Sequence, residues 1–280
     1  MTRAGRKLTK QTTLTKRRRL VIELQVAVLV VWLGGWELAA RTKVVDPFFF
    51  SQPSAVWDQI VTWTTQGTSQ GSLGEQILVT LEEAAMGFVI GVVAGVVAGI
   101  ALGRIKILAD VFAPYIKVAN SIPRIVLGSL FIVAFGLGLA SKVLLVIVLV
   151  FFGVFFNAFQ GTREVDRNLM ANAKLLGASR WKVTTDVVMP SAFTWILASL
   201  HVSFGFAIIG AIVGEFLGSD RGLGNLIKAA QGNFNQSGVL ACMVLMAIVA
   251  LLAEFLITRL ERRLLRWRPP QHGDADLAVL

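Results

Sequence analysis

The stretch GTREVDRNLMANAKLLGASRWKVTTDVVMP, from Gly161 to Pro190, is polar and amphipathic and lies between two long apolar runs. The whole chain has 280 residues, of which 55% are hydrophobic and only 16% are charged. Its mean hydropathy is +0.69. Because soluble domains usually carry about a quarter charged residues, this composition predicts an all-α membrane protein with one polar loop held outside the lipid.

Apolar runs of about 20 residues, the length needed to cross a bilayer, predict six transmembrane helices. They lie near residues 20–40, 77–103, 113–136, 139–160, 191–214 and 238–260. The third run is long enough only if it begins near Ala113 and includes Pro123. Proline removes a backbone donor and disfavours helix at the residue before it, so we expect a broken helix there. Such a break is tolerated at membrane depth only inside protein or beside a cavity.

The distribution of Lys and Arg predicts the orientation of the chain. With six spans and the N-terminus inside, the cytoplasmic segments hold 20 of these residues and the outer segments hold five. Positive residues collect in cytoplasmic loops, so we expect both termini and the polar loop in the cytoplasm. The predicted organisation is a basic tail over 1–19, a membrane domain over 20–265 containing the loop 161–190, and a second cytoplasmic tail over 266–280. The same rule explains the net charge of +10 without nucleic acid.

Two further patterns concern packing and exposure. Glycine recurs every four residues in the second span, which predicts close contact with a neighbouring helix; the positions are Gly87, Gly91, Gly95, Gly99 and Gly103. A short interfacial helix is expected after Ser54, which could cap it, with Trp57 on its apolar face. Glu82 and Glu83, near the outer end of the second span, are expected at the water-facing surface.

Several kinds of chemistry are excluded by composition. One cysteine, Cys242, and two histidines, His201 and His272, cannot form an intrachain disulfide or an ordinary zinc site, so no metal site is predicted. No G-x-x-x-x-G-K-[ST] phosphate loop is present, so any ATPase would be another polypeptide. An embedded enzyme would need paired carboxylates or a nucleophile beside a base at one depth, and none is found. The run at 20–40 is too long for a signal peptide and predicts a retained span.

Read from Ala171, the polar loop resembles the EAA-x3-G-x9-I-x-LP signature of binding-protein-dependent ABC importer permeases. The matching positions are Ala173, Gly177, Val187, Met189 and Pro190. Ala171 stands in place of the glutamate and Asn172 in place of the second residue, an alanine. Further segments resemble the nitrate, sulfonate and taurine branch of this family: 53–57, 121–123, 135–138, 176–179, 215–218 and 222–224.

The resemblance implies a type I ABC importer permease fold, with two permease chains, expected to be a homodimer, around one pore. Two cytoplasmic ATPases would bind ATP and Mg, so no cofactor is expected in this chain, and a periplasmic or lipid-anchored binding protein would deliver the substrate. The implied location is the bacterial inner membrane. The residues expected to couple the loop to the ATPase are Ala171, Ala173, Gly177, Ala178, Ser179, Arg180, Trp181 and Pro190.

Five residues are candidates for the translocation path: Asn120, Ser121, Arg124, His201 and Glu215. Arg124 could draw anions into the pore or form a structural ion pair. His201 could contact substrate or join two helices, and Glu215 could act at a gate or form a structural pair. The expected substrate is a small oxyanion of the sulfonate, taurine or nitrate type. The alternatives are a neutral heterocycle such as a thiamine-precursor pyrimidine, carried by the same architecture, and an ATP-independent secondary transporter.

Overall fold

The computed structural model describes residues 3–165 and 167–264, and in this part of the chain the structure is almost entirely helical. The helices in order are α1 (Arg3–Arg41), α2 (Pro47–Phe50), α3 (Pro53–Thr65), α4 (Leu73–Arg104), α5 (Lys106–Ser121), α6 (Val126–Phe135), α7 (Leu139–Arg163), α8 (Arg167–Leu175), α9 (Arg180–Val183), a π-helical turn η1 (Thr184–Val188), α10 (Met189–Leu217), α11 (Leu223–Gly232) and α12 (Gln236–Leu264). The predicted tail 266–280 lies outside the described residues.

Five of the described helices are long and apolar enough to cross a membrane, and α5 with α6 makes a sixth span if the bent pair is counted as one. The predicted break is present, because α5 ends at Ser121 and α6 begins at Val126 with a bend of 96° between them. Ile122, the residue before Pro123, is extended, as the proline ring requires. The third span nevertheless begins at Lys106, earlier than its apolar content indicated.

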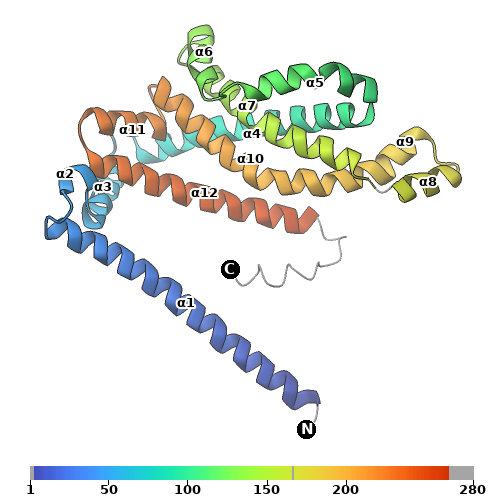
Figure 1. Ribbon diagram of the computed structural model, residues 1–280. Coiled ribbons are helices and arrows are strands. Elements are labelled where there is room, and N and C mark those ends of the chain that lie inside the picture. Colours follow the sequence, from blue (N-terminus) through green and yellow to red (C-terminus); the bar gives the residue numbers. More distant parts are fainter. Residues whose placement is uncertain (1–2, 166, 265–280) are drawn as a thin grey trace.

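The core of the molecule lies where α4, α7 and α10 pack together (Figure 1). Its fully buried residues are Ala84, Val146, Val150, Val154, Ala207, Ile208 and Ala211. The glycine ridge of α4 packs closely against a neighbouring helix, as the spacing predicted, and that helix is α7. A methyl group on Gly99 would lie 2.6 Å from the Cβ of Ala158 and 2.7 Å from the backbone oxygen of Phe155. The absence of side chains therefore sets the distance between the two helices.

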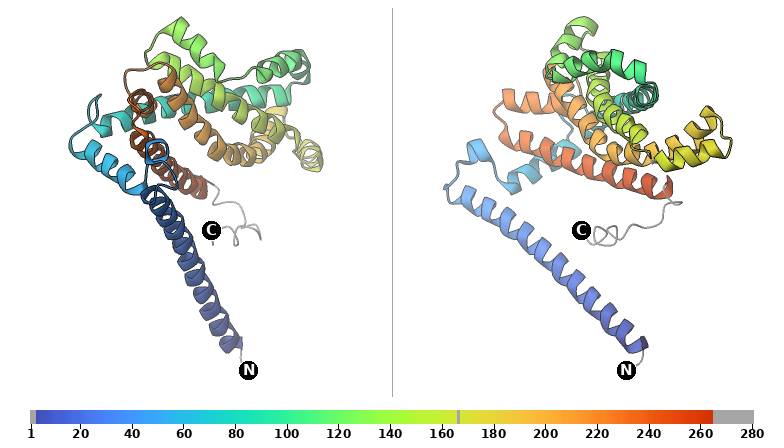
Figure 2. Two further views of the ribbon diagram at one scale, coloured as in Figure 1. Left: turned by 60° about the vertical axis from the view of Figure 1, so that its left-hand side comes forward. Right: turned by 45° about the vertical axis from the view of Figure 1, so that its right-hand side comes forward.

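Helix α1 extends away from this core (Figures 1 and 2), and the side chains of its apolar stretch are exposed in the single chain. It is attached through Glu37, whose carboxylate accepts hydrogen bonds from the Ser54 backbone N–H at 3.0 Å and hydroxyl at 2.9 Å. Ser54 therefore does not cap α3, contrary to expectation; the helix begins one residue earlier, at Pro53, and the hydroxyl contacts α1 instead. Trp57 is exposed on α3.

The glycine ridge leads to a stability prediction. We expect Gly99→Ala to destabilise the protein, because its methyl group would meet both a side chain and the backbone of α7. Overpacking of this kind costs about 1–3 kcal/mol. Gly74→Ala, on the same helix where nothing lies within 4 Å of the added methyl group, is the matched control. The measurement is the thermal unfolding midpoint of each variant in detergent; equal midpoints for both would contradict the packing account.

Candidate functional site

The polar loop folds into two short helices joined at Gly177. Helix α8 ends at Leu175, Gly177 takes a left-handed conformation with φ of +80°, and α9 begins at Arg180. The Ala178 N–H donates to the Ala173 carbonyl at 3.0 Å, which closes the turn. The Ser179 hydroxyl accepts a hydrogen bond from the Lys182 N–H at 3.2 Å and so caps α9. Gly177 suits this turn because glycine adopts positive φ without steric cost.

The small residues of the loop are used for internal packing. Val165, Val183 and Val188 form a buried cluster against which Ala173 and Ala178 pack, together with Met170 and Val187. The large apolar side chains point the other way: Leu175 is 85% exposed, Leu176 89% and Trp181 76%. The loop is thus a small folded unit whose outer surface includes exposed apolar side chains. Ala171 is also exposed. Helix α9 begins at Arg180, whose side chain lies outside the described part of the chain.

Two connections join this unit to the membrane helices. On one side η1 runs directly into α10, with Pro190 in the first turn of that helix, where proline is tolerated. On the other side the Arg104 guanidinium, at the end of α4, donates to the Thr184 hydroxyl at 2.7 Å. The loop therefore contacts both α4 and α10, and any displacement of the loop acts on both helices.

The break between α5 and α6 brings three of the predicted path residues together. The guanidinium of Arg124 donates to the Asn120 side-chain oxygen and lies 4.8 Å from the centre of the Phe152 ring. The Ser121 hydroxyl donates to the Lys117 carbonyl at 2.8 Å. Asn120 and Ser121 also line a cavity of about 490 Å³ between α4, α5 and α7. The cavity beside this break matches the requirement for irregular backbone at membrane depth.

The other two predicted path residues lie elsewhere. His201 on α10 is hydrogen-bonded through Nδ1 to the Glu254 carboxylate on α12 at 2.7 Å, so it joins two spans. Glu215 lies at the far end of α10 and is completely buried. His201 and Glu215 therefore both bond to side chains of other helices, which is the structural role that the sequence allowed for each. A role for either residue in the translocation path stays a prediction.

Glu215 belongs to a group of side chains that cap helix α11 from outside it. Its carboxylate accepts the Thr80 hydroxyl at 2.7 Å and the Gly224 N–H at 2.6 Å. Thr80 in turn accepts the Leu223 N–H at 3.0 Å, and the Gln76 side-chain oxygen accepts the Gly222 N–H at 2.7 Å. Three N–H groups at the start of α11 are therefore bonded by side chains from α4 and α10. These are groups that a helix cannot satisfy by itself.

Two glycines at the start of α11 have no room for a side chain. A methyl group on Gly222 would overlap the Glu215 carboxylate, and one on Gly224 would overlap the backbone oxygen of Ile212. Gly222 also has a φ of +98°, which favours glycine. The spacing of these two glycines thus allows the carboxylate to reach the backbone, and a negative charge is favourable at this end of a helix.

Glu83 lies beside this group, and the expectation that it would be exposed was wrong. Glu82 is exposed, but only 3% of Glu83 is accessible, and its Oε2 accepts no hydrogen bond. Glu83 interacts electrostatically with Glu215 and with Lys142, which is 1% exposed and donates to the Leu137 and Gly138 carbonyls. A sequence signal for this burial existed: Glu83 precedes Gly87 by four residues and so lies on the glycine face of α4.

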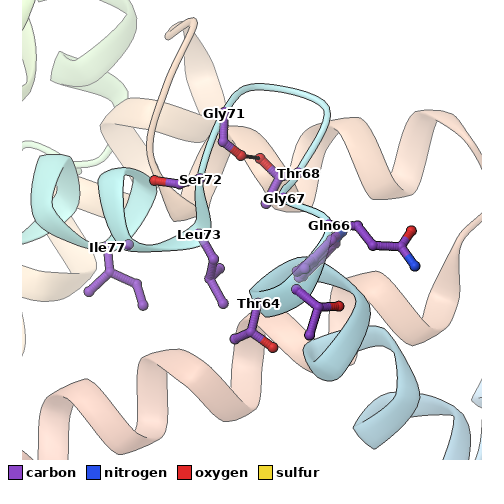
Figure 3. Close-up of a pocket in the computed structure, with 11 residues that line it drawn as sticks. Thr64, Gln66, Gly67, Thr68, Gly71, Ser72, Leu73 and Ile77 are labelled. Carbon is purple, nitrogen blue, oxygen red and sulfur yellow. Dashed lines mark hydrogen bonds between the residues drawn. The ribbon is translucent and has the colours of Figure 1, made fainter.

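A second cavity, of about 630 Å³, lies at the turn between α3 and α4 (Figure 3). The Thr68 hydroxyl donates to the Gly71 carbonyl at 2.8 Å and closes this turn, as the figure shows. The described residues that line the cavity supply hydroxyl, amide and apolar groups, and none of them is charged. The cavity is separate from the five predicted path residues, none of which lines it.

The external cap of α11 can be tested by removing one hydroxyl. We expect Thr80→Val to lower stability by about 1–3 kcal/mol, because it leaves the Leu223 N–H and one Glu215 oxygen unsatisfied in a buried site. Thr62→Val is the matched control, since that hydroxyl is exposed and bonds only the Asp58 carbonyl of its own helix. The thermal unfolding midpoint in detergent is the measurement. A loss in the Thr62 variant as large as that in the Thr80 variant would contradict the cap.

Comparison with known proteins identifies the family. Residues 87–266 match the family described as binding-protein-dependent transport system inner membrane component. The riboflavin transport system permease protein RibX of Chloroflexus aurantiacus is 33% identical over 239 residues, covering 85% of this chain and 88% of the relative. The taurine transport system permease protein TauC of Escherichia coli is 28% identical over 256 residues, covering 91% and 92% respectively.

A solved amino acid ABC transporter has the same fold, with a TM-score of 0.56 at 20% identity over 67% of this chain and 92% of that one. The helical fold and the candidate spans agree with this likeness. The family consists of membrane permeases and not enzymes. The chain therefore belongs to the binding-protein-dependent inner-membrane permeases of ABC transporters, and its fold is that of the type I importers.

Proposed function

We propose that this permease imports a small oxyanion and receives the movement of a partner ATPase through the loop 171–190. Membership of the family implies an ATPase and a substrate-binding protein as partners. The observation that carries the proposal is the folded loop. It exposes Leu175, Leu176 and Trp181 while its small residues hold it rigid, and it is joined to both α4 and α10. An exposed apolar surface of this kind is typical of a protein contact.

The proposed assembly contains two copies of this chain, two ATPases that bind ATP and Mg, and one binding protein. In support, the apolar stretch of α1 is exposed in the single chain apart from Ala40 near its end, although Glu37 attaches the helix to α3. The faces of α5 and α6 also carry many exposed apolar side chains, among them Val118, Val126 and Val133. Two chains packed around a pore would cover part of this surface. The ATP-independent transporter does not agree with the family and is set aside.

An oxyanion is the proposed substrate because one relative is named for taurine and because Arg124 lies at the break in the third span. The riboflavin-named relative favours a second candidate, a heterocycle without an anionic group. The two candidates differ in charge, and cations in a poorly screened site attract anions. The cations beside the break therefore favour the oxyanion.

We propose that the N-terminus, the loop and the C-terminal end of α12 face the cytoplasm. The bias of 20 Lys and Arg against five supports this orientation. The fold is compatible with it, because the N-terminal end of α1, the pair α8–α9 and the end of α12 lie toward one end of the molecule, and α2, α3 and α11 toward the other (Figure 1).

Coupling is tested at Gly177. A Cβ at this position meets nothing within 4 Å, so a side chain there would project from the loop surface, although the φ of +80° strains the backbone of any residue other than glycine. We expect Gly177→Arg to insert and fold, but to lower ATP-driven uptake and substrate-stimulated ATPase activity at least tenfold, because the projecting side chain blocks the contact. Gly177→Asn is the matched control, since asparagine tolerates positive φ and is small. Normal uptake by the arginine variant would overturn the proposed coupling.

Orientation is tested by labelling with an impermeant thiol reagent. In a background without Cys242, we expect Thr68→Cys to react from outside in intact cells and Ser179→Cys to react only after the cells are opened. Ser179 is exposed and Thr68 is partly exposed in the single chain. Access of the reagent to each cysteine therefore depends on the side of the membrane on which it lies. Labelling of the Ser179 variant in intact cells would contradict the proposed orientation.

A further inference from the structure

The cavity between α4, α5 and α7 contains a cation that has no partner among the described residues. Lys117 lines this cavity and its ammonium group makes no hydrogen bond or ion pair in the part of the chain that the structure describes. It lies about 16 Å along α5 from the first residue of that helix, at 1.5 Å per residue, and so in the interior of the candidate span that α5 and α6 form together. Charged groups at such a depth normally pair with one another or face a water-filled path.

Arg124, the cation singled out in the sequence, is engaged differently. It contacts Asn120 and the ring of Phe152, so its guanidinium already has partners. Arginine can only donate hydrogen bonds, so the oxygen of the Asn120 amide must face it. The NH₂ group of that amide is then left to donate. Lys117 and Asn120 are three residues apart on one helix and lie on the same face of it.

The opposite wall of the cavity is aromatic. Phe155, Phe156 and Phe159 of α7 line it. The rings of Phe155 and Phe159 are stacked with centroids 6.0 Å apart, and the ring of Phe156 meets Phe155 edge-on at 5.2 Å. No acidic side chain lines the cavity, so an ammonium group on the ligand would have no counter-charge there. A volume of about 490 Å³ is within the usual range for small-molecule sites.

We propose that this cavity binds an aromatic oxyanion, an arylsulfonate or arylcarboxylate, as a subsite of the translocation path. Lys117 and the Asn120 amide hold the anionic group, Arg124 orients that amide, and the phenylalanine wall holds the flat ring. The absence of an acidic lining residue favours this class over an amino-sulfonate such as taurine. The inference rests on the proposed import of an oxyanion and narrows its substrate class.

The test measures binding of p-toluenesulfonate to the purified full-length permease in nanodiscs, where no ATPase or binding protein is needed. We expect saturable binding, at least tenfold weaker binding of the neutral p-toluenesulfonamide, and weaker binding of ethanesulfonate, which has no ring. Lys117→Gln should weaken p-toluenesulfonate binding at least tenfold, because it removes the charge and keeps most of the side-chain volume. Lys117→Arg should retain most of it.

Lys106→Gln is the matched control, because it removes a lysine from the same helix outside the cavity. It should bind p-toluenesulfonate like the parent, and unfolding midpoints should show that all variants are folded. Phe156→Leu should weaken the toluene compound more than ethanesulfonate. Equal affinity of Lys117→Gln and Lys106→Gln, or equal binding of sulfonate and sulfonamide, would overturn the proposal. Binding that disappears in nanodiscs with phosphatidylglycerol would also overturn it, because a lipid headgroup would then be the occupant.

Uptake by the reconstituted complex separates this inference from the proposed function. If ATP-driven uptake of an oxyanion is found and Lys117→Gln leaves its rate and apparent KM unchanged, the importer proposal stands and the subsite is wrong. If no oxyanion is imported although p-toluenesulfonate binds through Lys117, the proposed substrate of the importer is wrong and the cavity is a binding site of another kind. A raised KM for an aryl anion in Lys117→Gln, with Lys106→Gln normal, supports both.

Discussion

The first N–H groups of α11 depend on side chains from other helices, and this constraint organises one whole end of the molecule. Gln76 and Thr80 of α4 and Glu215 of α10 supply the acceptors, so α4, α10 and α11 can adopt only one relative position if all are to be used. Unsatisfied backbone groups cost several kcal/mol in hydrocarbon. The same carboxylate fills the space that a side chain on Gly222 would need, and at Gly224 the backbone oxygen of Ile212 and the Glu215 side chain together do so. The close packing around the two glycines and the hydrogen bonds to the backbone of α11 thus require the same relative position of α4, α10 and α11.

The two ends of the protein are connected by α10. This helix has 29 residues and is about 44 Å long at 1.5 Å per residue. Its first turn contains Pro190, directly after the loop, and Glu215 lies near its last residue in the buried polar group. Because α10 also packs along α7 and against α4, a displacement at the loop is passed to a helix that is held at the far end by hydrogen bonds. The single π-helical turn η1 lies between the loop and this rigid element, where a local change of helix geometry is possible.

Most of the fold followed from the sequence because the strongest signals are local. The lengths of the apolar runs predicted the spans, and Pro123 predicted the break. The glycine spacing predicted that α4 packs closely against a neighbouring helix, which is α7. The turn at Gly177 followed from a spacing as well. What could not be predicted depends on partners distant in the chain. The pairing of Ser54 with Glu37 and the contacts of Glu83 with α7 and α10 are tertiary interactions. The position of Lys117 opposite a phenylalanine wall likewise depends on the packing of α5 against α7.

The buried ionisable groups have a consequence for how the protein is made. Glu83, Lys142 and Glu215 lie on three different spans, α4, α7 and α10, which leave the ribosome in that order. Lys142 is the fourth residue of α7 and Glu215 is the third from the end of α10, so neither lies at the centre of its span, but a buried ionisable group still needs a partner. The spans that carry Glu83 and Lys142 are therefore synthesised well before the acceptors and donors of α10 and α11 exist. Opposite charges on α4 and α7 can compensate each other during this interval, because these two helices pack side by side in parallel along the glycine ridge. The buried polar group of Glu83, Lys142 and Glu215 can then assemble only after α10 and α11, in the last third of the chain, have been synthesised.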